Sequence, residues 1–289
     1  MMNYFRVISS KPQNPFENMA LDEAIFKEVS AGNSPPTLRF YTWEYPSVSI
    51  GYFQNPKTDL YLDQLKTKKI PWVRRITGGR GIFHSEELTY SLSAPVSLTF
   101  LSPKSIGQSH PETSEPFFPN SIKGTYHKIS LGFLKGFQRL GLPVHLYASP
   151  SENRSLAEIK KNRSNPLCFS TPSWFETMIE KKKVVGSAQK RFKNGFLQQG
   201  SILLNHRFED FKDYFQLLPE DLHEFVGIFD FLQKEIPLPV LEAELISGME
   251  EAWGIQFKRE EPTQRETALC NDLTKQKYGK NSWNFDRIF

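Results

Sequence analysis

The chain has 289 residues, of which 38% are hydrophobic, and it carries a formal net charge of +4. This length and composition predict one domain with a sizeable core, and the mild basic excess suits an acidic protein partner more than a nucleic acid. The sequence has two cysteines and lacks any long apolar run, which excludes a disulfide scaffold and a membrane span. Because no signal-like segment follows Met1, we expect a cytoplasmic protein.

Hydrophobic spacing predicts a mixture of helices and strands without regular alternation. The clearest helical spacing puts Leu21, Ile25 and Val29 on one face. In chain order the expected elements are strand 4–9, helix 15–29, strands 38–40 and 48–50, helix 58–68, strands within 73–92, helix 126–140, strand 144–147, paired strands 183–189 and 196–204, and helices 239–253 and 263–278. This pattern predicts an α+β fold with a mixed or mainly antiparallel sheet and flanking helices. The proline- and serine-rich stretch 102–116 indicates a surface loop.

A glycine-rich segment between two of these strands is the first candidate binding element. This glycine segment (74–81) reads Arg74-Arg75-Ile76-Thr77-Gly78-Gly79-Arg80-Gly81, and His84 follows it. Glycines let the backbone approach a ligand and aim N–H groups at a carbonyl, while the arginines supply positive charge. The alternative is an ordinary hairpin turn. A dinucleotide-binding loop is excluded because the glycine spacing differs and a strand follows instead of a helix.

Cys168 and Lys183 are the second candidate, a thiol nucleophile and its activator. Lys183 begins the segment Lys183-Val184-Val185-Gly186-Ser187-Ala188-Gln189. A nearby ammonium favours the thiolate, which is the reactive form of cysteine, so the pair suits acyl transfer. The alternative is a small buried cysteine and a solvated lysine, since Lys181 and Lys182 extend the run of charge.

The histidines show none of the spacings typical of a metal site, such as His-Glu-x-x-His, and no paired-cysteine motif occurs. We therefore expect neither a metal nor another cofactor. His84 is either a general base or a structural histidine with satisfied hydrogen bonds. The remaining histidines are His110, His127, His145, His206 and His223.

Several spaced motifs together resemble the lipoyl and octanoyl transferase superfamily, which also holds lipoate-protein ligases and, more distantly, biotin-protein ligases. They are, in family order, Asn18-Met-Ala-Leu-Asp22-Glu23-Ala24, Pro36-Thr37-Leu38-Arg39-Phe40-Tyr41-x-Trp43, the glycine segment with Glu87-Leu-Thr-Tyr-Ser91, Cys168-Phe-x-x-Pro172-Ser173-Trp174, the Lys183 segment and Leu197-Gln-Gln-Gly200-Ser201-Ile202. The arginine after the glycine pair resembles LipM-type octanoyltransferases, because ligases usually have a third glycine there. Two positions depart from the pattern: Gly81 replaces the usual alanine, and Gln199 replaces the usual histidine.

The resemblance implies a catalytic domain like that of biotin/lipoate-protein ligases over 1–254, with a C-terminal strand and helix, 255–289, added to the same domain. It implies transfer of octanoyl from octanoyl-acyl carrier protein, through a Cys168 thioester favoured by Lys183, to a lipoyl-domain lysine. The acceptor would be the glycine-cleavage H protein or the acyltransferase subunit of a 2-oxoacid dehydrogenase, with no nucleic acid and no membrane involved. The implied substrate-binding residues are Arg75, Thr77, Gly78, Gly79, Arg80, His84, Gly186, Ser187 and Ala188.

Three other functions stay open at the level of sequence. An ATP-dependent lipoate-protein ligase would share the fold, the glycine segment and the lysine, but it makes an acyl-adenylate and needs no thiol. An octanoyl amidotransferase would move octanoyl between two lipoyl-domain proteins, again through a cysteine thioester. A non-catalytic carrier-binding protein would need neither Cys168 nor Lys183. Transfer from the carrier without nucleotide would separate the first function from these three.

Overall fold

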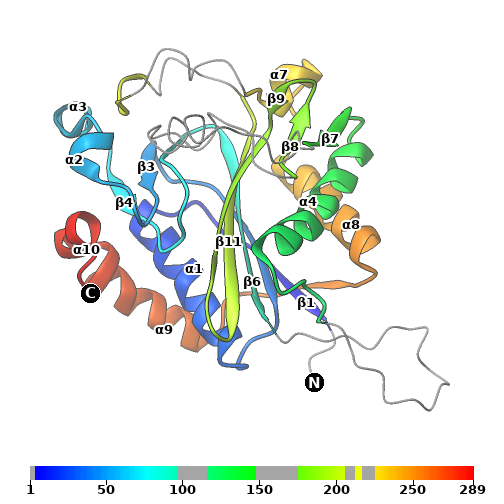
Figure 1. Ribbon diagram of the computed structural model, residues 1–289, viewed down its shortest axis with the longest axis horizontal. Helices are drawn as coiled ribbons and strands as arrows, with labels where there is room; N and C mark the ends of the chain where they lie inside the picture. The colour runs from blue at the N-terminus through cyan, green and yellow to red at the C-terminus, as the bar shows by residue number, and fades with distance from the viewer. Residues whose placement is uncertain (1–3, 97–115, 148–174, 206–211, 217–224) are drawn as a thin grey trace.

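A six-stranded mixed sheet forms the centre of the molecule (Figure 1). The computed structural model describes residues 4–96, 116–147, 175–205, 212–216 and 225–289. The sheet order is β10-β11-β6-β2-β1-β12, antiparallel from β10 to β2 and parallel from β2 to β12. Its strands are β1 (Phe5–Ser9), β2 (Thr37–Tyr41), β6 (Glu87–Pro95), β10 (Val185–Arg191), β11 (Gly195–Leu203) and β12 (Phe257–Arg259). This mixed sheet with flanking helices confirms the predicted α+β class.

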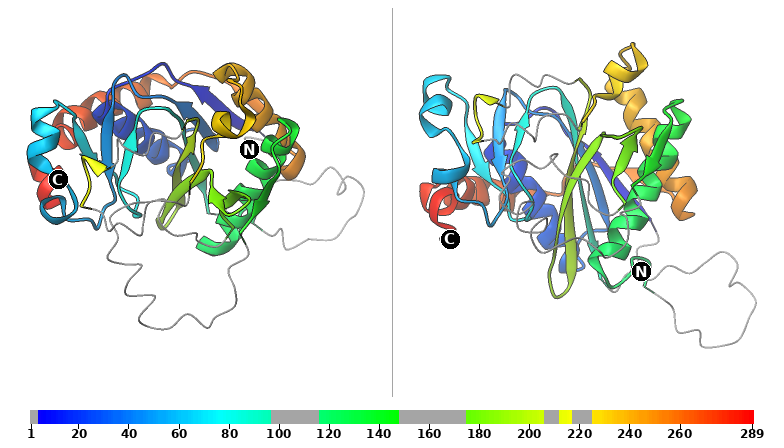
Figure 2. Two further views of the ribbon diagram at one scale, coloured as in Figure 1. Left: turned by 90° about the horizontal axis from the view of Figure 1, so that it is seen from above. Right: turned by 45° about the horizontal axis from the view of Figure 1, so that its top comes forward.

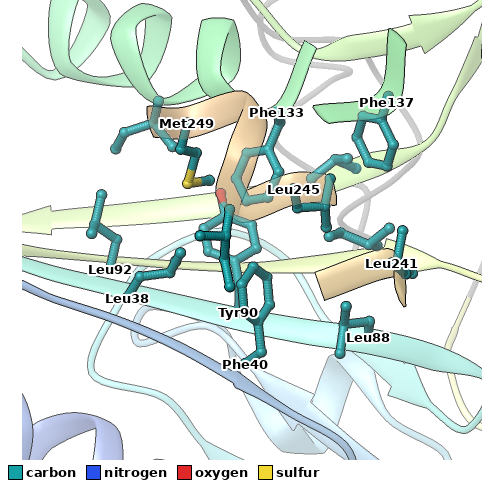
Figure 3. Packing of buried hydrophobic residues seen from close by; sticks show 14 of the residues in the cluster. Leu38, Phe40, Leu88, Tyr90, Leu92, Phe133, Phe137, Leu241, Leu245 and Met249 are labelled. Atoms are coloured by element: carbon teal, nitrogen blue, oxygen red, sulfur yellow. The ribbon is translucent and has the colours of Figure 1, made fainter. Parts of the chain in front are cut away.

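One face of this sheet is apolar and is covered by two helices, α4 (Ile122–Arg139) and α8 (Leu238–Trp253). Strand alternation puts Leu38 and Phe40 on this face, together with Leu88, Tyr90 and Leu92. Figure 3 shows these side chains meeting Phe133 and Phe137 of α4 and Leu241, Leu245 and Met249 of α8. Burying each such side chain contributes about 1.5–3 kcal/mol, so this layer is the main source of stability.

The two helices α4 and α8 cross at glycines. A Cβ atom added to Gly248 would lie 2.1 Å from the backbone nitrogen of Gly136, and one added to Gly136 would lie 2.7 Å from the Cα atom of Leu245. Only residues without side chains allow this backbone approach. The crossing therefore fixes how closely α8 can pack over the sheet.

We expect Gly248→Ala to lower the free energy of unfolding by about 1–3 kcal/mol, because the new methyl group must push the helices apart. Urea unfolding would measure this loss. Ser247→Ala on the same helix is the control and should change stability by less than about 0.5 kcal/mol. A stabilised Gly248→Ala variant, the usual result in an open helix, would contradict the close crossing.

The opposite face of the sheet is covered by helix α1 (Pro15–Ser30) and by the C-terminal helices, as Figure 2 also shows. Asn14 caps α1, because its side chain accepts hydrogen bonds from the backbone N–H groups of Phe16 and Glu17, both at 3.0 Å. Leu21, Ile25 and Val29 are buried against the sheet, as their spacing predicts. The same face also carries buried polar side chains, which build the site described below.

A second sheet of three strands, β4-β3-β5, packs beside α1. Its strands are β3 (Ser47–Ile50), β4 (Trp72–Arg74) and β5 (Ile82–His84). The central strand β3 separates β4 from β5, pairing parallel with the first and antiparallel with the second. The glycine segment between β4 and β5 is therefore not a hairpin turn, and that alternative is wrong.

The helix predicted over 58–68 is also wrong, because two short helices occur there: α2 (Pro56–Asp59) and α3 (Leu62–Thr67). Between them the backbone is extended and pairs with a distant segment. The N–H of Tyr61 donates to the carbonyl of Tyr214 at 3.0 Å, and the N–H of Gln216 donates to that of Asp59 at 3.1 Å. A hydrogen-bonded contact between distant segments thus interrupts the local helical pattern.

A third sheet consists of β7 (Val144–Leu146), β8 (Thr177–Ile179) and β9 (Lys182–Lys183), and α7 (Ile228–Leu232) follows β11 in the chain. The strand predicted over 183–189 is in fact two strands in different sheets. Lys183 ends β9, which pairs with β8, whereas β10 pairs with β11 as predicted. The chain changes sheets at Val184.

The C-terminal segment returns to the start of the chain. Strand β12 pairs parallel with β1 and forms one edge of the central sheet. Next come α9 (Gln264–Leu273), the single π-helical turn η3 (Thr274–Tyr278) and α10 (Asn281–Asp286), so the predicted helix over 263–278 is present. Buried Glu266 of α9 accepts two hydrogen bonds from the buried guanidinium of Arg6, at 2.5 and 3.0 Å. Throughout the described part of the chain, every helix is too short or too polar to cross a bilayer.

Candidate active site

A small, partly open cavity lies between the polar face of the central sheet, α1 and the three-stranded sheet. Its free volume is only about 20 Å³, room for about one water molecule, so side chains must move before a larger ligand can enter. Aromatic and aliphatic side chains form much of its wall, and a few polar groups converge on it. It is lined by Met19, Tyr41, Trp43, Ser49, Arg75, Ile82, His84, Thr89, Ala188, Gln199, Gly200 and Ser201.

The buried Arg75 holds the glycine segment over this cavity. Its Nη2 donates to the carbonyl oxygens of Gly78 at 3.0 Å and Arg80 at 2.9 Å, and its Nη1 donates to Ser49 Oγ at 2.7 Å. Gly79 has φ +80°, a conformation that side-chain-bearing residues rarely adopt. The arginine predicted as a ligand contact therefore also fixes the backbone of its own loop.

Ser49, His84 and Glu87 form a continuous buried hydrogen-bonded chain. Ser49 Oγ lies 2.6 Å from His84 Nε2, and His84 Nδ1 lies 2.5 Å from Glu87 Oε1. The indole of Trp43 stacks on the imidazole at 3.7 Å between ring centroids. Because the carboxylate accepts, Nδ1 carries the proton and Nε2 accepts from the serine, as in a neutral imidazole. Burial lowers the pKa of His84, which outweighs the opposing effect of Glu87.

The lowered pKa of His84 predicts a pH-dependent loss of stability. The unfolded chain takes up a proton on this histidine as the pH falls below about 6.5, while the folded protein resists it, so the free energy of unfolding should fall by up to about 1.4 kcal/mol per pH unit between pH 6.5 and 5. Glu87, whose pKa is lowered mainly through His84 against the effect of burial, adds its own loss only below about pH 4.5. Urea unfolding across this range should show a shallower slope for His84→Gln. The exposed-residue control His145→Gln should keep the slope, and equal slopes in all three proteins would refute the assignment.

A second polar network surrounds the carboxylate of Asp22 on α1. It accepts from the guanidinium of Arg39 at 2.7 Å, from Tyr41 at 2.9 Å, from Ser91 at 2.6 Å and from the side-chain amide of Gln199 at 2.7 Å. Asp22 and Arg39 are both almost fully buried. This network ties α1 to three strands and fixes the cavity floor.

Both departures from the family pattern lie beside the cavity. Gln199 accepts a hydrogen bond from Thr77 at 2.8 Å, so it links the glycine segment to α1 in the place of the usual histidine. At Gly81 an added Cβ would lie 2.2 Å from a ring carbon of Phe215, which explains why alanine is not tolerated without a shift of that ring.

An open cleft adjoins the cavity at Ala188, which lines both. The cleft follows β10, the edge strand of the central sheet, and α4 forms its other wall. Figure 1 shows α4 beside this edge. The cleft is lined by Gly79, Ile122, Lys123, Tyr126, Ser187, Ala188 and Gln189.

Lys183 is buried, unlike its exposed neighbours Lys181 and Lys182, so it is not a solvated member of that run. Its Nζ lies 2.6 Å from Glu176 Oε1, and the side chains of both partners in this ion pair are almost fully buried. Cys168 lies outside the described residues. The other cysteine, Cys270, is buried under α1, and burial raises the pKa of its thiol, which disfavours its reactive form.

The structure gathers most of the predicted site residues around the cavity and the cleft. Arg75, His84 and Ala188 line the cavity, and Gly79 and Ser187 line the cleft with Ala188. Gly78 and Arg80 accept hydrogen bonds from Arg75, and Thr77 donates one to Gln199 in the cavity wall. The other two lie apart from both linings: they are Gly186, buried within β10, and Lys183.

Sequence reasoning missed two contributors to this region, Ser49 and Glu176, and gave Trp43 only as part of a family motif. The alternation Ser47-Val48-Ser49-Ile50 was a usable signal, because it places two serines on one face of a strand. Nothing in the sequence marks Glu176 as the partner of Lys183. Among the residues that the structure describes, no group of three or more His, Cys, Asp and Glu side chains could hold a metal ion.

Comparison with known proteins identifies the family of this chain. Residues 14–227 match the family model described as the lipoyl protein ligase A/B catalytic domain. The chain is 37% identical to the octanoyltransferase LipM of Anoxybacillus flavithermus over 98% of both chains, and 34% identical to that of Bacillus subtilis over 98% of both. The octanoyltransferase LipM of Staphylococcus epidermidis is 35% identical over 99% of both.

Solved structures agree on the fold. A lipoate-protein ligase A crystallised with ATP superposes with a TM-score of 0.75 at 22% identity, covering 100% of both chains. A lipoate-protein ligase from Thermoplasma acidophilum gives the same TM-score and identity, covering 100% of this chain and 98% of that one. These likenesses confirm the predicted ligase-like catalytic fold. Together with the family model and the full-length relatives, they show that the chain belongs to the lipoyl protein ligase A/B catalytic domain family, among its LipM octanoyltransferases.

Proposed function

We propose that this octanoyltransferase takes octanoyl from octanoyl-acyl carrier protein onto Cys168 and passes it to a lipoyl-domain lysine. The cavity carries the proposal, because its wall includes the apolar side chains of Met19, Tyr41, Trp43 and Ile82, the kind of lining that an acyl chain needs, and it would have to widen to admit eight carbons. The cavity adjoins the cleft at one end, so a chain held inside would leave its carbonyl at the mouth. The carrier-borne donor would place the reaction in the cytoplasm.

The proposed reaction has two acyl-transfer steps. The Cys168 thiolate attacks the donor thioester, a new carbon–sulfur bond forms, and the carrier thiolate leaves and takes up a proton. The neutral amine of the acceptor lysine then attacks the octanoyl-Cys168 thioester. An amide forms, the amine loses a proton, and the Cys168 thiolate is released. Since a thioester already carries the activation, no nucleotide is consumed.

The glycine segment and β10 supply the candidates for stabilising the oxyanion in each step. Backbone N–H groups at Gly78 and Gly79, or at Gly186 and Ser187, would donate to the carbonyl oxygen as its charge develops. Such a donor is worth roughly 3 kcal/mol in acyl-transfer enzymes. The rigid hold of Arg75 on its loop supports the first pair.

Lys183 is proposed to stabilise the Cys168 thiolate. Its ion pair with Glu176 holds a buried positive charge fifteen residues after Cys168 in the chain. We expect Lys183→Ala to slow acylation and to shift iodoacetamide labelling of Cys168 toward alkaline pH. Lys183→Arg should keep part of the effect, because the charge remains but the head group is larger and flat. If both variants kept the wild-type pH dependence of Cys168 labelling, Lys183 would not be the group that stabilises the thiolate.

One incubation tests the whole proposal. The protein is mixed with octanoyl-acyl carrier protein and an apo lipoyl domain without nucleotide, and the acceptor mass is followed. Octanoyl-acceptor should appear. A strict requirement for ATP with free octanoate or lipoate would indicate a ligase instead, and transfer only from an octanoylated lipoyl-domain protein would indicate an amidotransferase. The glycine-cleavage H protein and the acyltransferase subunit of a 2-oxoacid dehydrogenase are the proposed acceptors to compare.

A further inference from the structure

The cleft along β10 exposes a strand edge beside the cavity mouth. Strand β10 pairs with β11 on one side, and no strand in the described ranges pairs with its outer edge over residues 186–190. Such an edge offers unpaired backbone N–H and C=O groups to an extended ligand. The opposite wall comes from α4, where Ile122 and Tyr126 give apolar surface and exposed Lys123 gives positive charge.

Gln189 carries an acceptor oxygen that none of the described residues uses. Its side-chain Nε2 donates to Gln198 Oε1 at 3.0 Å, and Gln198 donates through Nε2 to the Tyr90 hydroxyl at 2.8 Å. These two bonds fix the direction of the Gln189 amide. Its Oε1 is buried and has no hydrogen-bond partner among the described residues. A buried acceptor without a donor costs about 1–3 kcal/mol, so this atom calls for a ligand N–H group.

A donor group stands next to this acceptor. The Ser187 hydroxyl lies 2.8 Å from the Tyr90 hydroxyl. When Tyr90 donates to Ser187, the serine proton is available to a ligand carbonyl. Ser187 and Gln189 are two positions apart and so lie on the same face of β10. The cleft therefore presents an acceptor and a donor to one side of an extended chain, which is the pattern that an amide group fills.

Positive charge lies farther along the same face. Arg191 is about 10 Å from Ala188 at the usual rise of about 3.3 Å per strand residue. Its guanidinium donates to the Thr125 hydroxyl at 2.8 Å, and in the described part of the chain it has no carboxylate partner. Lys123, which lines the cleft and lies over the ring of Phe175, adds a second positive charge that would attract a phosphate.

We infer that the cleft binds the 4′-phosphopantetheine arm of the acyl donor, with Gln189 and Ser187 contacting an arm amide and with Lys123 and Arg191 facing the phosphate. The arm is an extended chain with two amides, a phosphate at one end and the acyl thioester at the other. Its thioester end would reach Ala188, where the cleft meets the cavity. The inference rests on the proposed function and adds the part of the donor that this edge recognises.

The test compares two donors in single-turnover acylation of Cys168, followed by intact mass. Octanoyl-pantetheine has both amides, whereas p-nitrophenyl octanoate has no arm. The quantity compared is kcat/KM for octanoyl-pantetheine divided by kcat/KM for p-nitrophenyl octanoate. We expect Gln189→Leu to lower this ratio by about tenfold, because one hydrogen bond is lost. Lys190→Gln, on the opposite face of β10, should keep the wild-type ratio. Thermal unfolding would show that both variants are folded.

A second comparison isolates the phosphate. Octanoyl-4′-phosphopantetheine should have a lower KM than octanoyl-pantetheine with the wild-type protein, and this gain should shrink at least threefold in Lys123→Gln. Unchanged ratios in Gln189→Leu and in Lys123→Gln would overturn the inference. So would a Gln189→Leu variant that acylates normally but delivers octanoyl slowly to the acceptor, because the cleft would then hold the acceptor. A wild-type protein that no donor acylates at Cys168 would instead refute the proposed function itself.

Discussion

Replacing Cys168 by alanine should abolish octanoyl transfer, with a loss of at least about 1,000-fold, because the proposed covalent intermediate cannot form. Wild-type protein mixed with octanoyl-acyl carrier protein should gain the mass of one octanoyl group, and hydroxylamine should remove it. The variant should show no such gain. Circular dichroism and thermal unfolding should match the wild type, since only a side chain is changed.

Cys270 provides the matched control for this experiment. Its thiol is buried beneath α1, near the carbonyl of Glu17, and burial raises its pKa. Cys270→Ala should therefore keep the octanoyl adduct and the transfer activity, at a modest cost in stability from lost packing. Turnover by Cys168→Ala, or loss of the adduct in Cys270→Ala, would refute the assignment of the nucleophile.

Asp22→Ala should lower the free energy of unfolding by about 3–5 kcal/mol, because it strands the buried guanidinium of Arg39 and removes the acceptor of three further hydrogen bonds. The free energy of unfolding of a typical domain is about 5–15 kcal/mol, so this substitution would remove a large part of it. Urea unfolding measures it.

An exposed ion pair gives the comparison for this stability effect. Glu251 lies 3.0 Å from Lys135, and both side chains are about half exposed. Glu251→Ala should cost less than about 1 kcal/mol, since solvent screens such pairs. A loss for Asp22→Ala no larger than that of Glu251→Ala would show that the Asp22 network does not support the fold.

Local periodicity was sufficient to predict elements whose structure is decided locally. The apolar spacing of α1 and the residues that stop α4 lie within a few turns, so the sequence window contains the whole cause. It failed at Leu60 and Tyr61, where the backbone pairs with Tyr214 and Phe215, far along the chain. A window of ten residues cannot contain such a partner.

The residues of the candidate site likewise fall into those that local motifs predict and those that only the fold brings together. Arg75, His84 and Ala188 belong to contiguous motifs, and all three line the cavity. Glu176 is paired with Lys183 only because β8 and β9 fold back in one register, which no residue pattern states. The role of Cys168 stays a prediction, since it lies outside the described residues.

The ion pair between Arg6 and Glu266 constrains the order in which parts of the protein fold. Strand β1 is the second strand from one edge of the sheet, and most of the chain separates it in sequence from its outer neighbour β12. Most of the chain also separates Arg6 of β1 from Glu266, whose carboxylate neutralises it. Until that late segment is made, a nascent chain that buried β1 would enclose an uncompensated charge. Sheet closure is therefore a late, slow step, as expected for contacts of such long sequence separation. During synthesis the N-terminal strand must wait, exposed, for the last part of the protein to emerge.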